Sequence, residues 1–387
     1  MLTAGRPRVV VTGMGTVNAA TAGGTEALAA GLARGQSPIA PVRAFPVEGC
    51  SSRLAAEVDD ATLAALVDRD MARRLSRICQ LSVAACRLAV DDAGIGGGPR
   101  LGIVVGTEHG DFRSSEEFAA GFLRRGPSGL SPMIFPNTVM NAMAAVAAIA
   151  VGARGPSVTL NQATVAGDLA VARAAAMIAG GRAAAVLAGG VDELCGPVYR
   201  RLAEMRALSP MLGGGLEGCR PFATDHNGPV LGEGATFLVL EALEAARARG
   251  AAIHAEVLDV AWGNVPAAPH SVGRRRPDRL SPVRDFFQRL ARSPRAVLRC
   301  YGAGNGDPGV DDWERALLAH DLPDVAREAG LGAPPESLAP LFGQHGGLGG
   351  LRVAAAALDA ARGRGPALIH GIARGGCRVA LLLGPRA

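Results

Sequence analysis

The sequence predicts an α/β protein built from two similar halves, and three observations support this prediction. Short apolar runs without polar alternation recur along the chain and end in glycine, as strands covered on both faces do. Ala-rich stretches of helical length separate these runs. The chain has 387 residues, which is enough to bury a large core and suits two domains or two fused halves.

The predicted elements follow from these patterns. Continuous apolar runs predict strands at residues 8–15, 101–110, 183–190, 235–243, 255–263, 295–304 and 377–385. Ala-rich stretches predict helices at residues 25–35, 71–94, 145–153, 167–181 and 353–364. Each half repeats a strand, a glycine turn, a buried helix and a further strand, and ARARGAAIH breaks the helical pattern between them. We therefore divide the chain into residues 1–250 and 251–387.

The composition indicates a globular protein and argues against a nucleic-acid reader. Apolar residues make up 49% of the chain and charged residues 19%. The net charge is only +5, and all basic residues are scattered arginines except for the cluster GRRRPDR at 273–279. Nucleic-acid readers concentrate basic charge and interleave aromatic residues. We interpret 273–279 as a solvated loop, with a landing patch for an acidic partner protein as the alternative.

The cysteines and the apolar segments point to a soluble, cytoplasmic protein. Seven cysteines form no C-x-x-C pair, which predicts neither a disulfide framework nor a metal site. The chain enters its first strand without an apolar signal segment, and the Ala-rich run at 142–152 is too short to span a membrane. Gly13 and Gly15 lack the third glycine of a dinucleotide-binding turn, so no cofactor is expected.

Several stretches together resemble one known family. They are RVVVTGMG near the start, GARGPSVTL, AAAVLAGGVDE with EMRALSP, and CRPFATDHNGPVLGEGATFLVLEALEAARARGA at 219–251. The chain resembles the ketosynthases of the thiolase-like fold, which are the condensing enzymes of fatty acid and polyketide synthesis. The resemblance implies two α/β halves in a five-layered α-β-α-β-α architecture that dimerises.

Active members of this family use a cysteine nucleophile, two histidines and a supporting lysine. In this chain the cysteine position matches Thr164 in QATVAG, and the histidine positions match Tyr301 in YGAGN and Gln344 in FGQ. The lysine position matches Ala339. A threonine hydroxyl needs an adjacent base to attack, and these positions supply none. We therefore expect no catalytic residue, with Thr164 filling space and bonding to a nearby carbonyl.

Other polar residues are candidates for the catalytic roles that these four positions lack. His345 is next to Gln344, and His109 follows a predicted strand; we interpret both as structural histidines. Glu108 and Asp111 beside His109 are interpreted as solvated. The alternative is a ketosynthase-like enzyme of altered chemistry, an acyltransferase, cyclase or isomerase, that uses Thr164, His345 or His109 on carrier-bound acyl chains.

The resemblance also implies a role for a family member that lacks the catalytic residues. Family members without the cysteine are chain length factors, which pair with a catalytic ketosynthase α subunit in type II polyketide assembly and narrow a tunnel for the carrier-bound acyl chain. The implied partners are that subunit and an acyl carrier protein with its phosphopantetheine arm. The region 131–143 matches the stretch that reaches the partner subunit. Candidates for the tunnel or interface are Phe112, Phe118, Phe122, Met133, Ile134, Phe135 and Met140.

Two further interpretations stay open. Each bulky candidate could be an ordinary core residue instead of a tunnel residue. The chain could also be a homodimeric scaffold that binds acyl carrier proteins and has no influence on chain length.

Overall fold

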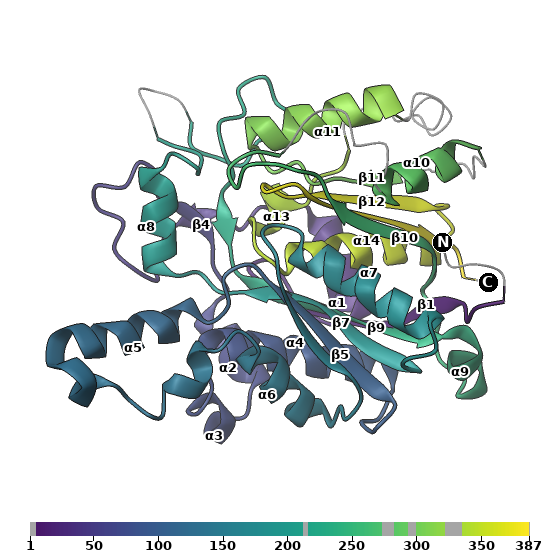
Figure 1. Ribbon diagram of the computed structural model, residues 1–387, viewed down its shortest axis with the longest axis horizontal. Coiled ribbons are helices and arrows are strands. Elements are labelled where there is room, and N and C mark those ends of the chain that lie inside the picture. Colours follow the sequence, from purple (N-terminus) through teal and green to yellow (C-terminus); the bar gives the residue numbers. More distant parts are fainter. Residues whose placement is uncertain (1–4, 212–215, 273–281, 293–298, 322–334, 387) are drawn as a thin grey trace.

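A computed structural model describes residues 5–211, 216–272, 282–292, 299–321 and 335–386 (Figure 1). The cluster at 273–279 and part of the predicted strand at 295–304 lie outside these residues. No helix in the described part of the chain combines the length and apolar character needed to cross a bilayer.

The strands form one large mixed sheet with the order β11-β12-β13-β10-β1-β9-β7-β5-β6, and β2 pairs with β1. The strands of this sheet are β1 (Val9–Asn18), β2 (Ala22–Gly23), β5 (Leu101–Thr107), β6 (Ser157–Asn161), β7 (Ala185–Asp192), β9 (Gly234–Ala242), β10 (Ala255–Asn264), β11 (Arg299–Tyr301), β12 (Ala367–Ile372) and β13 (Cys377–Gly384). A small second sheet contains β3 (Ala40–Pro41), β4 (Leu54–Ala56) and β8 (Leu231–Gly232).

The large sheet contains an internal repeat. β1 pairs with β9 antiparallel, β9 with β7 antiparallel, and β7 with β5 parallel. β10, β13, β12 and β11 repeat the same three pairings in the same order. Antiparallel pairing of β1 with β10 joins the two series. The second series begins at β10, and on that ground we keep the division at residue 250 as a proposal.

Helices cover the sheet in layers. The longer helices are α1 (Thr25–Arg34), α4 (Arg77–Ala93), α5 (Phe112–Arg125), α6 (Ala142–Val151), α7 (Ala166–Ala179), α8 (Gly196–Glu204), α10 (Pro282–Arg292), α11 (Pro308–Asp321) and α14 (Leu348–Ala361). The short ones are α2 (Asp60–Leu66), α3 (Arg69–Ala72), η1 (Gly126–Gly129), η2 (Phe135–Thr138), α9 (Leu243–Ala248) and α13 (Ala339–Phe342).

The central layer consists of α7 and α14, which contact each other and both strand series. α4 and α6 pack on the outer face of the β1–β5 series, and α10 and α11 on the outer face of the β10–β12 series. Figure 1 shows this succession from α11 and α10 at the top to α4 and α6 at the bottom. The thiolase-like α/β architecture expected from the sequence is confirmed.

Small residues bring the layers close together. A Cβ atom on Gly106 of β5 would lie 2.2 Å from the carbonyl oxygen of Ala166 in α7. A Cβ atom on Gly190 of β7 would lie 2.2 Å from the carbonyl oxygen of Gly346 before α14. The abundance of Gly and Ala is therefore a packing requirement, because larger side chains would push the central helices away from the strands.

Several boundaries differ from the sequence-based expectation. The predicted helix at 71–94 is divided into α3 and α4, with Ser76 at the N-terminal boundary of α4. The predicted strand at 101–110 ends at Thr107, where the chain turns toward α5. The strands β6 and β12 and the helix α5 were not predicted, since their apolar patterns are short or, in α5, interrupted by charges.

Candidate functional site

Thr164 lies immediately before α7, in a strained backbone conformation. Its φ of +51° is in the left-handed region, which is an outlier for a β-branched residue. Its hydroxyl donates a hydrogen bond to the carbonyl oxygen of Ile372, at 3.2 Å. Strained backbone conformations are common at functional sites. Here the strained residue carries a hydroxyl that is already hydrogen-bonded to a backbone carbonyl. The turn before α7 is therefore half-buried and carries no strong nucleophile.

Asp192, at the end of β7, connects three segments around this turn. Its carboxylate accepts hydrogen bonds from the hydroxyl of Thr107 at 2.7 Å and from the backbone N–H groups of Glu108 and His109 at 3.0 and 3.1 Å. It also accepts the N–H of Gly346 at 2.7 Å. The carboxylate is 2% exposed, so its charge is satisfied by these four donors. Asp192 therefore determines where Glu108 and His109 lie.

Gln344 reaches the site and is paired with a residue that the sequence analysis did not select. The side-chain amide of Asn305 donates to the Gln344 carbonyl oxygen at 3.2 Å, and both residues are buried. Neither amide can act as a general base at neutral pH. The sequence pattern that could have identified Asn305 is a polar residue in a glycine-rich turn after a buried strand.

The structure does not bring Tyr301 to the site. Its hydroxyl donates to Asp359 of α14 at 2.7 Å. In the parallel pairing of β11 with β12, Tyr301 is level with Ile369, three residues before the Ile372 that binds Thr164. Three strand residues correspond to roughly 10 Å. Burial raises the pKa of Tyr301, and the bond to Asp359 adds to this shift.

Ala339 lies at the start of α13 and is 1% exposed. It belongs to the apolar cluster formed by the central helices and the sheet. A methyl side chain there contributes packing and carries no proton. Among the four matched positions, Thr164 and Gln344 thus lie near the site, whereas Tyr301 and Ala339 contribute to the interior of the second half.

Two histidines lie beside the site. His345 is 2% exposed, and burial lowers its pKa to about 3, so the ring is neutral at physiological pH. Its Nδ1 accepts the backbone N–H of Gly347 at 3.1 Å. His109 is half-buried and lines the same small cavity as Gln344. His345 is therefore buried in the loop before α14, where its ring is hydrogen-bonded to the backbone.

Glu108 and Asp111 are also less solvated than expected. Burial raises the pKa of Glu108, and the charge of Asp192 adds to this shift. His109 and the backbone N–H of Thr164, which acts as a hydrogen-bond donor, oppose it. Asp111 is 4% exposed, because its carboxylate caps α5 by accepting the N–H of Ser114 at 3.0 Å. The sequence predicts that both carboxylates are solvated, whereas the folded chain buries Asp111 and leaves Glu108 half-buried.

The space around these groups is small. Glu108, His109, Asp192, Gln344 and His345 are among the residues that line a cavity of about 20 Å³. Such a cavity holds about one water molecule, whereas pockets for organic ligands occupy roughly 300–1,000 Å³. The described residues of a single chain therefore leave no room for an acyl chain at this centre.

The bulky candidates lie mostly on the surface. Met133 is 85% exposed and Phe135 57%, with Phe112, Phe122 and Met140 between 39% and 48%. Phe118 and Ile134 are half-buried, and the rings of Phe118 and Phe135 are 5.8 Å apart. Met140 also lines an open hollow of about 410 Å³ beside β6. Five of the seven are thus exposed, which is not how ordinary core residues behave.

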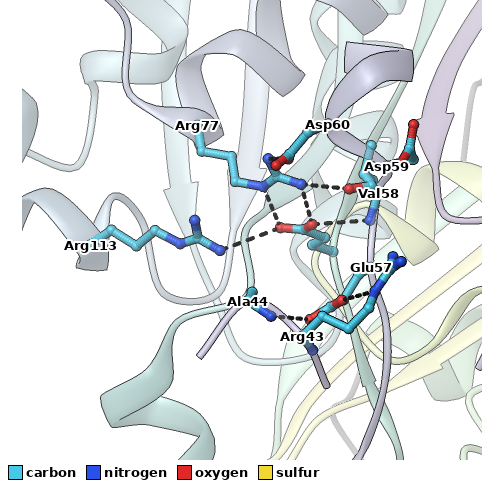
Figure 2. Close-up of a pocket in the computed structure, with 9 residues that line it drawn as sticks. Arg43, Ala44, Glu57, Val58, Asp59, Asp60, Arg77 and Arg113 are labelled. Atoms are coloured by element: carbon cyan, nitrogen blue, oxygen red, sulfur yellow. Dashed lines mark hydrogen bonds and ion pairs between the residues drawn. The ribbon is translucent and has the colours of Figure 1, made fainter. Parts of the chain in front are cut away.

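A second cavity of about 340 Å³ is lined by charged residues from α2, α4 and α5 and the segments beside them (Figure 2). Glu233 is buried at its centre and accepts two hydrogen bonds from Arg77, at 2.6 and 2.9 Å. Arg113 lies 3.9 Å from the same carboxylate. Glu233 also accepts the N–H of Val58 at 3.0 Å, so this cluster holds segments together. Its charges are mutually satisfied, which is typical of a structural role.

The cysteines show no sign of activation. Burial raises the pKa of Cys79 to about 12 and that of Cys377 to about 11. Cys300 is fully enclosed, and burial raises its pKa as well. Reactive cysteines have depressed pKa values. Among the described residues, no group of three or more His, Cys, Asp or Glu side chains is positioned to hold a metal ion.

Comparisons with known proteins identify the family. The family model described as "Beta-ketoacyl synthase, N-terminal domain" matches residues 6–246. The chain is 30% identical to "3-oxoacyl-[acyl-carrier-protein] synthase 2" of Synechocystis sp., over 89% of this chain and 83% of that protein. It is 31% identical to "Granaticin polyketide putative beta-ketoacyl synthase 1" of Streptomyces violaceoruber, over 91% and 85% of the two chains.

Solved structures give the same result. "The ishigamide ketosynthase/chain length factor" superimposes with a TM-score of 0.85 at 27% identity and covers 99% of this chain and 100% of that chain. A β-ketoacyl synthase from Burkholderia phymatum superimposes with a TM-score of 0.81 at 24% identity, over 98% and 100% of the chains, which supports the fold. The family model and the two curated relatives together cover most of the chain. It belongs to the β-ketoacyl synthase family.

Proposed function

We propose that this protein is the catalytically silent, cytoplasmic partner of a cysteine-bearing ketosynthase, and that the pair extends polyketide chains held on an acyl carrier protein. In this role the chain is a chain length factor, which shapes the acyl tunnel and transfers no acyl group itself. The observation that carries the proposal is the hydroxyl of Thr164, bound to the Ile372 carbonyl at the position where the family has its nucleophile.

The surroundings of Thr164 support this reading. Gln344 and Asn305 pair with each other as neutral amides, and His345 is buried with its Nδ1 occupied. Among the described residues, the Thr164 hydroxyl is hydrogen-bonded to the Ile372 carbonyl oxygen and not to a base. Without such a base a threonine is a poor nucleophile at neutral pH.

The exposed apolar surface near β6 supports the proposal of a partner chain. Exposed apolar side chains on α5 and η2 and before α6 lie on the same part of the chain as β6, the last strand of the large sheet. An unpaired edge strand beside apolar residues is a ready surface for another chain. The structural match at 27% identity is a ketosynthase/chain length factor, which supports a heterodimer as the form of that assembly.

The test is reconstitution with a ketosynthase that has intact Cys, His and His. We expect co-elution of the two chains in size exclusion, and condensation of malonyl units by the pair but not by this chain alone. Substituting Met140→Ala and Phe135→Ala should change the mass of the polyketide released, because both remove bulk from the proposed tunnel or interface. Met205→Ala, which removes an exposed apolar side chain at the end of α8, is the control.

A second candidate is an enzyme of altered chemistry that uses Glu108 or His109. Its supporting observation is that burial raises the pKa of the half-buried Glu108 carboxyl. Turnover of an acyl carrier substrate by the isolated chain, lost in His109→Ala, would favour it. If the pair forms but product length is unchanged in both bulk-removing variants, the chain is a scaffold instead.

A further inference from the structure

The helix α5 extends from the layered body and is attached to it at its first turn (Figure 1). Of its 14 residues, only Ser114 and Gly121 are buried. Its packing contacts are concentrated on η1 and η2, the two short helices that follow it along the chain. At the helix start, Nε of Arg113 donates to the carbonyl oxygen of Leu194 at 2.7 Å, in the segment after β7. The first turn therefore attaches a helix that has little other packing against the described elements of the body.

Two buried carboxyl groups lie at this first turn. Oδ1 of Asp111 accepts the backbone N–H of Ser114 at 3.0 Å, and Oε1 of Glu193 accepts the backbone N–H of Arg113 at 3.1 Å. The two donors are consecutive amides, whose nitrogen atoms are less than about 4 Å apart. Asp111 is 4% exposed and Glu193 5%, so neither carboxyl group is solvated. Both groups are thus enclosed in the same small region of the fold.

Each of the two carboxyl groups has one oxygen without a hydrogen-bond partner. These atoms are Oδ2 of Asp111 and Oε2 of Glu193, and no other buried carboxyl oxygen among the described residues lacks a partner. Buried polar atoms in proteins are normally hydrogen-bonded. A proton on one of the two groups supplies a donor to this region and removes one of two like charges.

The cations nearby balance one of these carboxylates and not both. Arg77 is hydrogen-bonded to Glu233, as described above, so this pair is complete. Arg113 remains, with its Nε 3.7 Å from Oε2 of Glu193, against the two carboxyl groups. The N-terminus of α5 adds only a partial positive charge. Burial and the charge of Asp111 raise the pKa of Glu193 to about 8, in agreement with this count of charges.

The other titratable groups around Glu193 leave this balance unchanged, with one candidate to test. The cavity that Glu193 lines is also lined by Glu108, His109, Asp192, Cys195 and His345. Asp192 has its own donors, and His345 is neutral because burial lowers its pKa to about 3. On the side of α4, burial keeps the thiol of Cys79 neutral by raising its pKa to about 12. His109 is the remaining base, and it is included in the experiment below.

We propose that Asp111 and Glu193 hold one proton between them, and that this carboxyl pair is a pH-sensitive latch for α5. With the proton bound, the pair carries one negative charge, which Arg113 and the helix amides balance. When the proton is lost to solvent, two buried anions lie at the first turn and repel each other, so the attachment of α5 loosens. Since α5 carries Phe112 and Phe122, the use of the latch to regulate pairing with a ketosynthase rests on the proposed function.

The experiment measures amide hydrogen exchange of residues 115–125 in the purified full-length chain at pH 6.5 and 8.5. Peptide mass spectrometry is the readout, and protection is corrected for the intrinsic pH dependence of exchange. Glu193→Gln is isosteric and uncharged. Asp111→Asn removes the other carboxyl group and keeps an oxygen that can cap the helix. The controls are His109→Gln and Glu117→Gln, the latter an exposed position on α5, and thermal melting reports whether each variant is folded.

The protection of α5 in the unaltered protein should fall at least about tenfold from pH 6.5 to 8.5, because the pKa of Glu193 drops from about 8 to about 4.3 when the first turn opens. The bound proton stabilises the closed turn fully below about pH 4.3, and this stabilisation is lost as the pH rises through about 8. Glu193→Gln and Asp111→Asn should show nearly equal protection at the two pH values, since neither retains the pair. His109→Gln and Glu117→Gln should retain the decline.

Equal protection at both pH values in the unaltered protein would overturn the latch, and so would a full decline in Glu193→Gln and Asp111→Asn. A decline that disappears only in His109→Gln would overturn it as well, because His109 would then be the titrating group. If one of the two carboxyl variants does not fold, the other decides the question.

The measurement needs no partner chain, so the latch and the proposed function can fail separately. A chain with pH-dependent protection of α5 that never pairs with a ketosynthase would support the latch and overturn the proposed function. A chain that pairs and shows flat protection would overturn the latch alone.

Discussion

At the scale of residues, one buried ion pair connects distant parts of the chain. Asp168 in α7 is fully buried and bonds to Arg352 of α14, which is 3% exposed. Arg352 also donates to the carbonyl oxygen of Gly302 at 3.0 Å, after β11. Removal of one partner from such a pair leaves an uncompensated charge in the interior. The stability of the central helix layer should therefore depend on both members.

We expect Arg352→Met to lower the free energy of unfolding by about 3–5 kcal/mol, because Asp168 stays buried without its cation. The measurement is denaturant unfolding at neutral pH. Arg362→Met, at the exposed end of the same helix, is the control and should change stability by less than about 0.5 kcal/mol. Equal stability of the two variants would contradict the assignment of this pair.

A pH dependence is expected from Glu193. Burial, followed by the charge of Asp111, raises its pKa to about 8, although Arg113 acts in the opposite direction. In the unfolded chain its pKa is about 4.3. The folded state thus binds the proton more tightly, so the contribution to stability is complete below about pH 4.3 and is lost as the pH rises to about 8.

Glu193→Gln should therefore flatten the decline in the free energy of unfolding between pH 5 and 8, which amounts to at most about 1.4 kcal/mol per pH unit for one group. Thermal or urea unfolding at several pH values measures this slope. Glu117→Gln, on the exposed side of α5, should retain the slope of the unaltered protein. A Glu193→Gln variant with an unchanged slope would show that another group titrates.

At the scale of elements, the start of α7 is positioned by the strands beneath it. Gly106 in β5 lets the backbone of Ala166 approach, and Gly167 in α7 lets the chain before α14 approach in turn. Thr164, with its φ of +51°, lies two residues before Ala166 and therefore directly precedes these close contacts in the chain. The geometry at position 164 persists because neighbouring elements hold it.

We expect Gly106→Ala to destabilise the protein by about 1–3 kcal/mol, since the added methyl group would meet a backbone oxygen that cannot move freely. Unfolding in denaturant measures the loss. Gly96→Ala is the matched control, because no atom lies within 4 Å of a Cβ placed there. The packing argument fails if both variants unfold at the same denaturant concentration.

Across the whole molecule, apolar surface is concentrated where α5 extends from the layered body (Figure 1). Phe112 and Phe122 are on α5, and Met133 and Phe135 follow it along the chain. The large exposed apolar residues of this region are more than scattered side chains would explain. This surface is the part of the molecule on which the proposed pairing depends.

We expect the double variant Met133→Ser/Phe135→Ser to weaken binding to a cysteine-bearing ketosynthase at least about tenfold, because both side chains lose apolar area at the proposed interface. Binding is measured by titration calorimetry or by co-elution at decreasing concentration. Met205→Ser, which is 59% exposed on α8, should leave the affinity unchanged. Unchanged affinity in the double variant would place the interface elsewhere.

Local sequence pattern was sufficient for much of the fold. The apolar runs became β1, β5, β7, β9, β10 and β13 within a few residues of the predicted bounds, because strands covered on both faces need continuous apolar sequence. The match of Thr164 to the family's cysteine position also comes from the sequence alone and stays a prediction. β6 and α5 were not predicted, because β6 has only a short apolar pattern and the apolar pattern of α5 is interrupted by charged residues.

The sequence alone determined the two-half α/β architecture and the residue types at the candidate site, since both depend on short-range pattern. Only the tertiary structure decided that Asn305 and not Tyr301 pairs with Gln344, that Asp192 binds the backbone N–H of Glu108, and that His345 is enclosed. The first two contacts join residues 39 and 84 positions apart in the sequence, and their geometry follows from how the layers pack.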